Sequence, residues 1–384
     1  MSATFINRQG ERDRLVVKLQ QIDWTFCALL AAIAGVGTVV LYSIAGGSWS
    51  PWAVKHLILF GFCFVAMIVL ATIDLRVWFT LAYPIYGLGL LMLLAVAVIG
   101  HSSLGAKRWL DLGPIRLQPS EIIKVGLVLA LARFYQGVDA HKARLSWRLL
   151  IPAALIGAPA ALVAHQPDLG TAILIAATGG LMMVLGGLSL PLAGAALAAV
   201  AAAAPVAFAF VLKPYQRARL LTFLHPEADR SGSGYHIIQS KIALGSGGAL
   251  GKGFGLGTQS QLNFLPEKST DFIFSSMAEE FGFLGCVSVL ALYAGVIYLG
   301  LRMASNAYSH FARMAAAGTI VTFALCVLIN GAMVMGLAPV VGVPMPLLSF
   351  GGTVMITMMA GFALVLSAKV HRYSEVGSGR GSIV

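Results

Sequence analysis

Charged side chains are scarce in this 384-residue chain, where Asp, Glu, Lys and Arg make up only 11% of the residues and apolar types make up 58%. A soluble globular protein carries roughly a quarter charged residues. A chain with so few charges cannot cover itself with polar surface, so much of its surface must face lipid. The scarcity of charge therefore excludes an ordinary water-soluble domain.

Cysteine is also rare. The four cysteines, Cys27, Cys63, Cys286 and Cys326, all fall inside apolar runs, where cysteine usually serves as a small buried residue rather than a disulfide partner or metal ligand. The histidines show no metal-binding spacing. The sequence therefore assigns no certain cofactor and no metal ligand. Participation of a divalent cation in the reaction stays an open alternative.

What the chain does contain is a series of apolar runs of about 20 residues, the length that crosses the hydrocarbon of a bilayer. Inside a bilayer the backbone must satisfy its own hydrogen bonds, so such runs predict helices, and they lack the alternation of a transmembrane β-barrel. We therefore expect an all-α, polytopic membrane protein with about ten transmembrane helices. The expected spans are 22–44, 52–72, 76–99, 119–136, 147–164, 169–187, 189–212, 273–300, 311–336 and 346–370.

Lysine and arginine in the short loops predict the orientation of these spans. They cluster in the two tails and in loops 137–146 and 301–313. With ten spans, these four segments all lie on the same side of the membrane. Because lysine and arginine concentrate on the cytoplasmic side, both termini are expected in the cytoplasm. The expected division is a cytoplasmic N-terminal tail (1–21), spans one to seven (22–212), a long extracytoplasmic loop (213–272), spans eight to ten (273–370) and a cytoplasmic C-terminal tail (371–384).

The net charge of +11 lies in loops beside lipid, which favours anionic headgroups or lipid-linked phosphates over nucleic acid as partners. The 213–272 loop is too long to be a simple connector. Its cations, Arg217 among them, form either ordinary solvated charge or a surface for an anionic substrate. Its glycine-rich segment 245–257 fits no nucleotide-binding spacing, which favours a flexible turn or backbone close to a lipid headgroup. The isoleucines of 235–244 predict a short helix lying on the membrane surface.

Glu121 and Lys124 are ionisable residues on one face of the fourth span, directly after Gln118-Pro119-Ser120. Ionisable groups at membrane depth are costly and usually functional. Pro119 and Ser120 suit a helix start, where Glu121 also favours the helix dipole. The pair is either a neutral ion pair that packs the helix, or a lysine held at headgroup depth for a phosphate and oriented by its glutamate.

Asp271 lies at the boundary between polar Thr270 and the apolar start of the eighth span. Low dielectric raises a carboxyl pKa and nearby cations lower it, and a general base near neutral pH needs such a balance. Asp271 is therefore either a helix cap or a base, and Glu267 is a weaker candidate beside it. Asp168, in the turn before the sixth span, has the same two alternatives: a cap or a group facing the site.

Six motifs together resemble the SEDS family of shape, elongation, division and sporulation proteins. They are Gly105-Ala-Lys-Arg-Trp-Leu-Asp-Leu-Gly113, Gln118-Pro-Ser-Glu-Ile-Ile-Lys124, Gln166-Pro-Asp-Leu-Gly-Thr171, Gly234-Tyr-His-Ile-Ile-Gln-Ser-Lys-Ile-Ala243, Leu265-Pro-Glu-Lys-Ser-Thr-Asp-Phe-Ile-Phe274 and Pro339-Val-Val-Gly-Val-Pro344. The resemblance runs in order over nearly the whole chain. Within the family, this sequence is most similar to the elongation members, with the division members as the close alternative.

The resemblance implies a peptidoglycan glycosyltransferase in a bacterial inner membrane that polymerises lipid II beside a class B penicillin-binding protein, of the penicillin-binding protein 2 type for elongation. The essential aspartate of the family matches Asp271, and Arg108, Glu121 and Lys124 match its other polar site positions. We also predict Gln118 and Glu267 as substrate-binding residues. We expect Asp271 to deprotonate the acceptor hydroxyl. We expect Arg108 and Lys124, assisted by Lys107, Arg217 or a divalent ion, to stabilise the leaving pyrophosphate. Two alternatives stay open: a flippase for lipid-linked precursors, and a non-catalytic scaffold for the penicillin-binding protein.

Overall fold

The structure, a computed structural model, describes residues 15–99, 101–103, 106–111, 116–137, 147–229, 232–265 and 267–376. Most of the N-terminal tail, most of the 137–146 loop and the end of the C-terminal tail lie outside these residues. The side chains of Lys107 and Arg108 also lie outside the description, although the backbone that carries them is described.

Each predicted span contains a helix. The ten helices are α2 (Trp24–Ile44), α3 (Ala53–Ala71), α4 (Leu75–Ile99), α5 (Pro119–Gln136), α6 (Leu150–His165), α7 (Leu169–Leu185), α8 (Leu190–Val206), α12 (Ile273–Ser305), α13 (His310–Val334) and α14 (Gly352–Val370). Within the described residues, seven helices are long and apolar enough to cross a membrane, and α6 and α7 are shorter apolar helices. The predicted all-helical membrane architecture is therefore confirmed.

Local capping residues set several helix starts. The Asp23 carboxylate accepts a hydrogen bond from the Phe26 N–H at 3.1 Å and caps α2. Pro119 occupies the first turn of α5, where its missing N–H costs nothing. The Asp168 carboxylate accepts from the Thr171 N–H at 3.3 Å and caps α7, so the capping alternative for Asp168 is confirmed.

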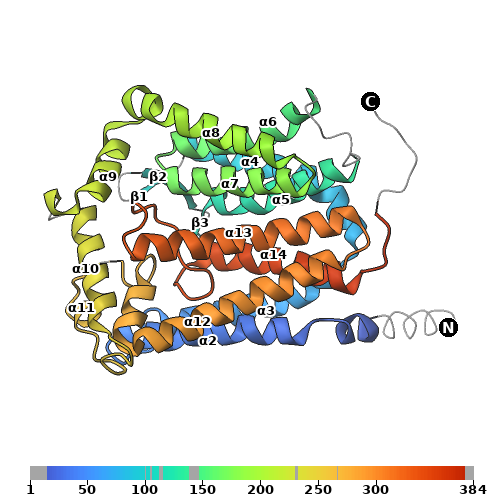
Figure 1. Ribbon diagram of the computed structural model, residues 1–384. Helices are drawn as coiled ribbons and strands as arrows, with labels where there is room; N and C mark the ends of the chain where they lie inside the picture. The colour runs from blue at the N-terminus through green and yellow to red at the C-terminus, as the bar shows by residue number, and fades with distance from the viewer. Residues whose placement is uncertain are drawn as a thin grey trace.

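The helices form two groups on either side of a central pair (Figure 1). Helices α13 and α14 pack against each other, with α5 and α7 against α13 and with α3 against α14. Helix α2 packs against α12 on one side, and α4 and α6 join α5 and α7 on the other. Helix α8 packs only weakly, against α7, and has no buried residue, so its alanine-rich surface is exposed.

An aromatic cluster joins the central pair to its neighbours. The Phe362 ring of α14 lies 5.5 Å from the Phe26 ring of α2 and 5.1 Å from the Phe323 ring of α13, and Tyr293 of α12 lies 5.5 Å from Phe323. These residues are among the largest fully buried side chains, and in lipid such rings hold helices together through van der Waals packing rather than through exclusion of water. The cluster therefore fixes α2 and α12 against the centre of the molecule.

The long loop is built from short helices that cover one end of the bundle, whereas the start of α2 and the end of α14 lie at the other end (Figure 1). These helices are α9 (Pro214–Leu224), α10 (Ser233–Ser246) and α11 (Thr258–Gln261). The predicted 235–244 helix is thus confirmed as part of α10. It packs on α12 and hydrogen-bonds through Ser240 to Ser275 and to the Val334 carbonyl, both at 2.7 Å.

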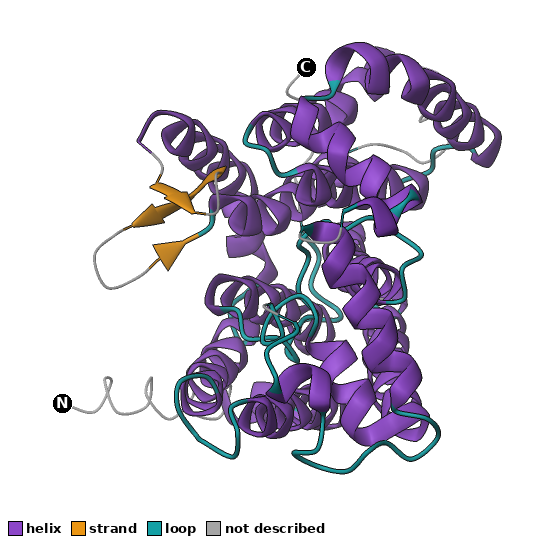
Figure 2. Cartoon of the chain, turned by 90° about the vertical axis from the view of Figure 1, so that its left-hand side faces the viewer, coloured by secondary structure: helices purple, strands orange, loops and turns teal. Residues whose placement is uncertain are grey.

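At the covered end lies a small three-stranded antiparallel sheet that the sequence analysis did not predict (Figure 2). Its strands are β1 (His101–Ser103), β2 (Ala106–Asp111) and β3 (Arg116–Leu117), in the order β1-β2-β3. Strand β2 contacts both α4 and α5. The sheet therefore places the Lys107-Arg108-Trp109 motif beside the start of α5.

Helix α12 is interrupted at Gly282, whose φ of 65° and ψ of −163° are accessible essentially only to glycine. The glycine-rich segment 245–257 docks onto this break. Amides of the segment donate to the carbonyls of Glu279 and Glu280, and amides after the break donate to carbonyls of the segment, at 2.9–3.1 Å. The structure shows that this segment is held by hydrogen bonds to a broken helix, so the predicted flexible turn is wrong, whereas the predicted headgroup contact stays a prediction.

Candidate functional site

A cavity of about 510 Å³ lies at the covered end of the bundle, beneath α9 and α10. Six segments far apart in the sequence form its walls: β2, the starts of α5 and α7, the long loop, the turn before α12, and the segment between α13 and α14. Its polar and charged lining side chains are Gln118, Glu121, Lys124, Thr171, Arg219, His236, Glu267, Thr270 and Asp271. Five of the eight predicted site residues therefore share one cavity.

Asp271 occupies a tight turn at the edge of this cavity. The N–H groups of Thr270 and Phe272 both donate to the Glu267 carbonyl, at 3.2 and 3.1 Å, and the half-buried Asp271 follows in the same turn. Gly342 lies opposite, where a β-carbon would come within 3.5 Å of Asp271 Oδ2. A β-carbon at Gly342 would therefore lie in ordinary van der Waals contact with the carboxylate, and the φ of 69° at this position favours glycine.

Asn330 of α13 holds the Asp271 turn in place. Its side-chain amide donates to the Asp271 carbonyl at 2.9 Å and to the Val343 carbonyl at 2.8 Å, and the residue is fully buried. One amide thus joins two walls of the cavity, the backbone of the Asp271 turn and the segment after α13.

The Glu121–Lys124 ion pair forms the deeper wall. The Lys124 Nζ lies 2.8 Å from Glu121 Oε2, and both side chains are about 95% buried. A buried charge without a partner costs several kcal/mol, so removing either member would leave the other uncompensated. The predicted pairing is confirmed. The pair also lines the cavity, so the two alternatives, an ion pair that packs the helix and a group that faces the site, do not exclude each other.

The predicted cations divide into three cases. Lys124 lines the cavity. Arg217 donates instead to the carbonyls of Leu212 and Ala209, at 2.9 and 2.8 Å, and is not among the lining residues. The side chains of Lys107 and Arg108 lie outside the description, but their neighbour Trp109 on β2 lines the cavity.

Arg219 and His236 are lining residues that the sequence analysis did not select as principal candidates. Arg219 follows Arg217 by two positions on α9, and His236 lies on α10. Burial lowers the pKa of the His236 imidazole, and the carboxylates of Glu267 and Asp229 partly oppose this change. His236 is therefore uncharged at neutral pH. In the sequence, both residues are marked only by their position in the long loop. That position does not predict which side of a helix faces the site.

The comparisons with known proteins agree with this architecture. The protein-family model described as "Cell cycle protein", which covers FtsW, RodA and SpoVE, matches residues 21–374. The chain belongs to the FtsW/RodA/SpoVE family. As a family member it is 44% identical to the peptidoglycan glycosyltransferase MrdB of Escherichia coli, over 91% of this chain and 94% of that protein. It is 36% identical to a probable peptidoglycan glycosyltransferase FtsW of Legionella pneumophila, over 79% and 77% of the two chains.

Solved structures extend the family comparison to the fold. A chain from a peptidoglycan synthase complex that coordinates polymerization and crosslinking superposes with a TM-score of 0.80 at 32% identity, covering 92% of this chain and 99% of that one. The rod shape determining protein RodA of Thermus thermophilus superposes with a TM-score of 0.68 at 30% identity, covering 92% and 98%. The predicted family, membrane fold and peptidoglycan glycosyltransferase activity are therefore confirmed.

Proposed function

We propose that this protein polymerises lipid II into glycan strands during cell elongation, with Asp271 as the general base. The observation that carries the proposal is that Asp271, Lys124 and Arg219, from three separate parts of the sequence, line one cavity. Lipid II is a disaccharide on a polyprenyl pyrophosphate, so its polymerisation needs a base for a sugar hydroxyl and cations for the pyrophosphate. The higher identity to MrdB than to FtsW supports elongation rather than division.

In the proposed reaction, the Asp271 carboxylate takes the proton of the acceptor 4-hydroxyl. The acceptor oxygen then bonds to the anomeric carbon of the donor chain while the bond from that carbon to the pyrophosphate oxygen breaks. The pyrophosphate leaves with the electron pair. Inversion at carbon needs one base, and a positioned base contributes roughly 10²–10⁴-fold to the rate.

Charge counting shows what the leaving group still requires. Among the described lining side chains, the cations Lys124 and Arg219 face the carboxylates Glu121, Glu267 and Asp271, which is two positive charges against three negative. A leaving pyrophosphate adds further negative charge that preorganised cations must stabilise. We therefore keep Lys107 and Arg108 of β2 as pyrophosphate-binding residues, with a divalent cation as the alternative source of charge.

The role of Asp271 is tested with the purified chain, a class B penicillin-binding protein and lipid II. Such a partner is proposed because the chain resembles a component of a peptidoglycan synthase complex. Asp271→Asn keeps the size of the side chain but removes the base, so the polymerisation rate should fall by about 10²–10⁴-fold. Glu375→Gln is the matched control, because Glu375 is an exposed carboxylate beyond α14 at the opposite end. An Asp271→Asn rate within threefold of this control would disprove the base and favour a scaffold.

We also propose that the cavity faces the outside of the cell and both termini face the cytoplasm. Support comes from the lysines and arginines at the ends of α12 and α14, because such residues concentrate on the cytoplasmic side. A single cysteine in place of exposed Leu256, in the long loop, should react in intact spheroplasts with a membrane-impermeant maleimide. A cysteine in place of exposed Glu375 should react only after lysis, and the reverse pattern would overturn the orientation.

A further inference from the structure

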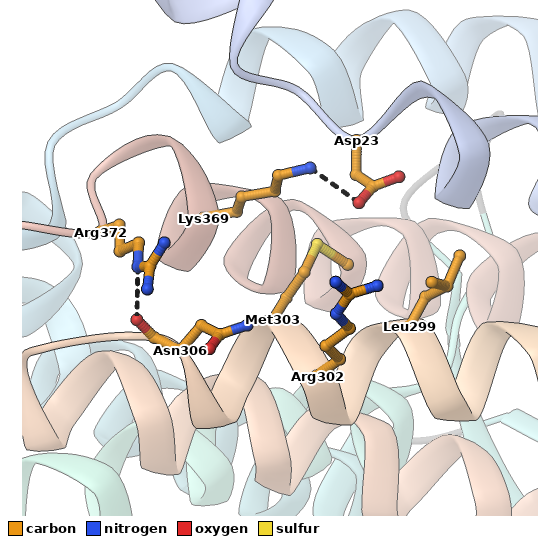
Figure 3. A pocket seen from close by; sticks show the side chains of 7 residues that line it. All are labelled: Asp23, Leu299, Arg302, Met303, Asn306, Lys369 and Arg372. Carbon is orange, nitrogen blue, oxygen red and sulfur yellow. Dashed lines mark hydrogen bonds and ion pairs between the residues drawn. The ribbon is translucent and has the colours of Figure 1, made fainter.

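A second pocket, of about 260 Å³, lies at the end of the bundle opposite the catalytic cavity. This volume is close to the lower end of pockets that hold small ligands, roughly 300 Å³. Its lining residues are Asp23, Leu299, Arg302, Met303, Asn306, Lys369 and Arg372 (Figure 3). The proposed glycosyltransferase reaction uses none of them.

Three helix ends bring these residues together. Asp23 is the N-cap of α2, Arg302 lies in the last turn of α12, and Lys369 lies in the last turn of α14. Cations at helix C-termini interact favourably with the helix dipole, which accounts for a basic residue on each of α12 and α14. It does not account for three basic residues around one hollow.

The charges inside the pocket are only partly compensated. The Lys369 Nζ lies 2.7 Å from Asp23 Oδ2, which neutralises both. Arg372 donates through Nε to the Asn306 carbonyl at 2.9 Å, which leaves its charge in place. Arg302 makes no side-chain hydrogen bond or ion pair with any described residue, and Figure 3 shows it extending from α12 toward the Lys369–Asp23 pair. Two guanidinium charges therefore remain available for an anion.

We propose that this pocket binds the phosphate of an anionic phospholipid headgroup, with Arg302 and Arg372 as its principal ligands. Guanidinium groups match phosphate oxygens in two-point hydrogen bonds, and basic pockets between helices at the cytoplasmic face suit anionic headgroups. The assignment of this face to the cytoplasm rests on the proposed orientation, whereas the binding itself does not.

The apolar part of the pocket favours a lipid over a free phosphate. Leu299 precedes Arg302 by one helical turn and lies deeper along α12, and Met303 is buried beside it. Tyr298 and Leu301 on the same stretch of α12 are exposed, at 64% and 43%, as expected for a lipid-facing surface. A headgroup held by the arginines can therefore continue into acyl chains along α12, which a soluble phosphate cannot do.

The Asp23 carboxylate competes with a bound anion, because it already forms an ion pair with Lys369. Asp23→Asn keeps an oxygen that can cap α2 through the Phe26 N–H, but it removes the negative charge and releases Lys369. This variant should bind the anionic lipid more tightly than the parent. An increase in affinity cannot result from misfolding, so the variant keeps the proposal testable where a loss of binding would be ambiguous.

The test measures binding of dioctanoyl-phosphatidylglycerol, dioctanoyl-phosphatidylcholine and glycerol 3-phosphate to the full chain in a neutral detergent, by native mass spectrometry. The parent should retain phosphatidylglycerol over both other probes. Arg302→Gln should weaken its binding by about fivefold, since one basic residue near a headgroup has an effect of that order. Arg302→Lys should lose less, because it keeps the charge but not the two-point geometry. Asp23→Asn should strengthen binding several-fold.

Arg76→Gln is the matched control, because Arg76 is an exposed arginine at the start of α4 on the same face and does not line the pocket. Equal losses in Arg302→Gln and Arg76→Gln would reduce the effect to general surface charge and overturn the site. Glycerol 3-phosphate binding as tightly as the lipid would overturn the lipid assignment. Polymerisation assays on the same variants separate this outcome from failure of the proposed function, because the catalytic cavity is untouched.

Discussion

Replacing Asn330 with leucine should disable the turn that carries Asp271, the proposed general base, without removing the Asp271 side chain. Asn330 is fully buried and donates to the carbonyls of Asp271 and Val343 at 2.9 and 2.8 Å. Leucine has a similar size but no donor, so both buried carbonyls lose their partner. Each unpaired buried carbonyl costs about 1–3 kcal/mol, which gives a loss of about 2–6 kcal/mol for the two.

Part of that cost should appear as movement of the turn, because the two carbonyls belong to the segments that carry Asp271 and face it. A displacement of about 1 Å at a reacting group can reduce a rate by about 10²-fold. We therefore expect kcat for lipid II polymerisation to fall by about 10–100-fold in Asn330→Leu, with a much smaller change in KM. The assay is steady-state polymerisation by the purified complex at a temperature where the variant remains folded.

Ser367→Ala is the matched control for this prediction. Ser367 is also fully buried and donates to a backbone carbonyl, that of Ile73 at 3.1 Å, but it lies at the opposite end of the bundle. Its loss should lower the thermal midpoint with little effect on kcat. If Asn330→Leu lowered kcat no more than Ser367→Ala at equal folded fraction, Asn330 would be a structural residue only, and the positioning argument would be wrong.

Two further variants test the supports of the site. Gly282→Ala should destabilise the protein by more than about 1–3 kcal/mol, because its backbone conformation is accessible essentially only to glycine and a β-carbon would meet the backbone of Gly251; thermal unfolding followed by tryptophan fluorescence measures the loss. His236→Gln should reduce the acid sensitivity of the fold. Because burial lowers the pKa of folded His236 below its unfolded value of 6.5, the unfolded state binds more protons as the pH falls through this range, and stability is lost.

Each of these two variants has a control and a contrary outcome. For Gly282→Ala the control is Gly331→Ala, a glycine inside α13 where a β-carbon meets nothing within 4 Å, and equal stability of the two variants would contradict the role given to the break. For His236→Gln, thermal midpoints are compared between pH 7.5 and 5.5. An unchanged pH dependence would mean that His236 does not titrate in this window.

The ten helices could be predicted because their cause is local. A run of about 20 apolar residues must form a helix in lipid wherever it lies in the chain. The start of α5 was equally readable, since Pro119 and Glu121 act within one turn, and the Glu121–Lys124 pair followed from helical spacing alone.

The side of α9 that faces the cavity could not be predicted, because it depends on which other elements the helix packs against. Arg217 and Arg219 are two positions apart, which is about 200° around a helix, so only one of them can face the cavity. Nothing in the local pattern distinguishes the two residues, and the prediction names Arg217. In the structure Arg219 lines the cavity, while Arg217 bonds to the end of the preceding span.

The glycine-rich segment shows the same limit for a whole loop. Its composition indicated freedom of the backbone, and that freedom is used for close approach to the break in α12. The partner of this approach, Gly282, lies inside a run that sequence alone predicts as continuous helix. Neither the glycine-rich segment nor the sequence around Gly282 contains a pattern that predicts contact with the other.

The amino-acid sequence by itself determined the membrane environment, the helices, their order and the residues with chemical potential, because these depend on the solvent and on neighbours within one or two turns. Only the tertiary structure decided which of those residues meet. The cavity joins six segments, and the second pocket joins three helix ends, through contacts between residues far apart in the chain, and the free energy of such contacts depends on packing that no local pattern encodes.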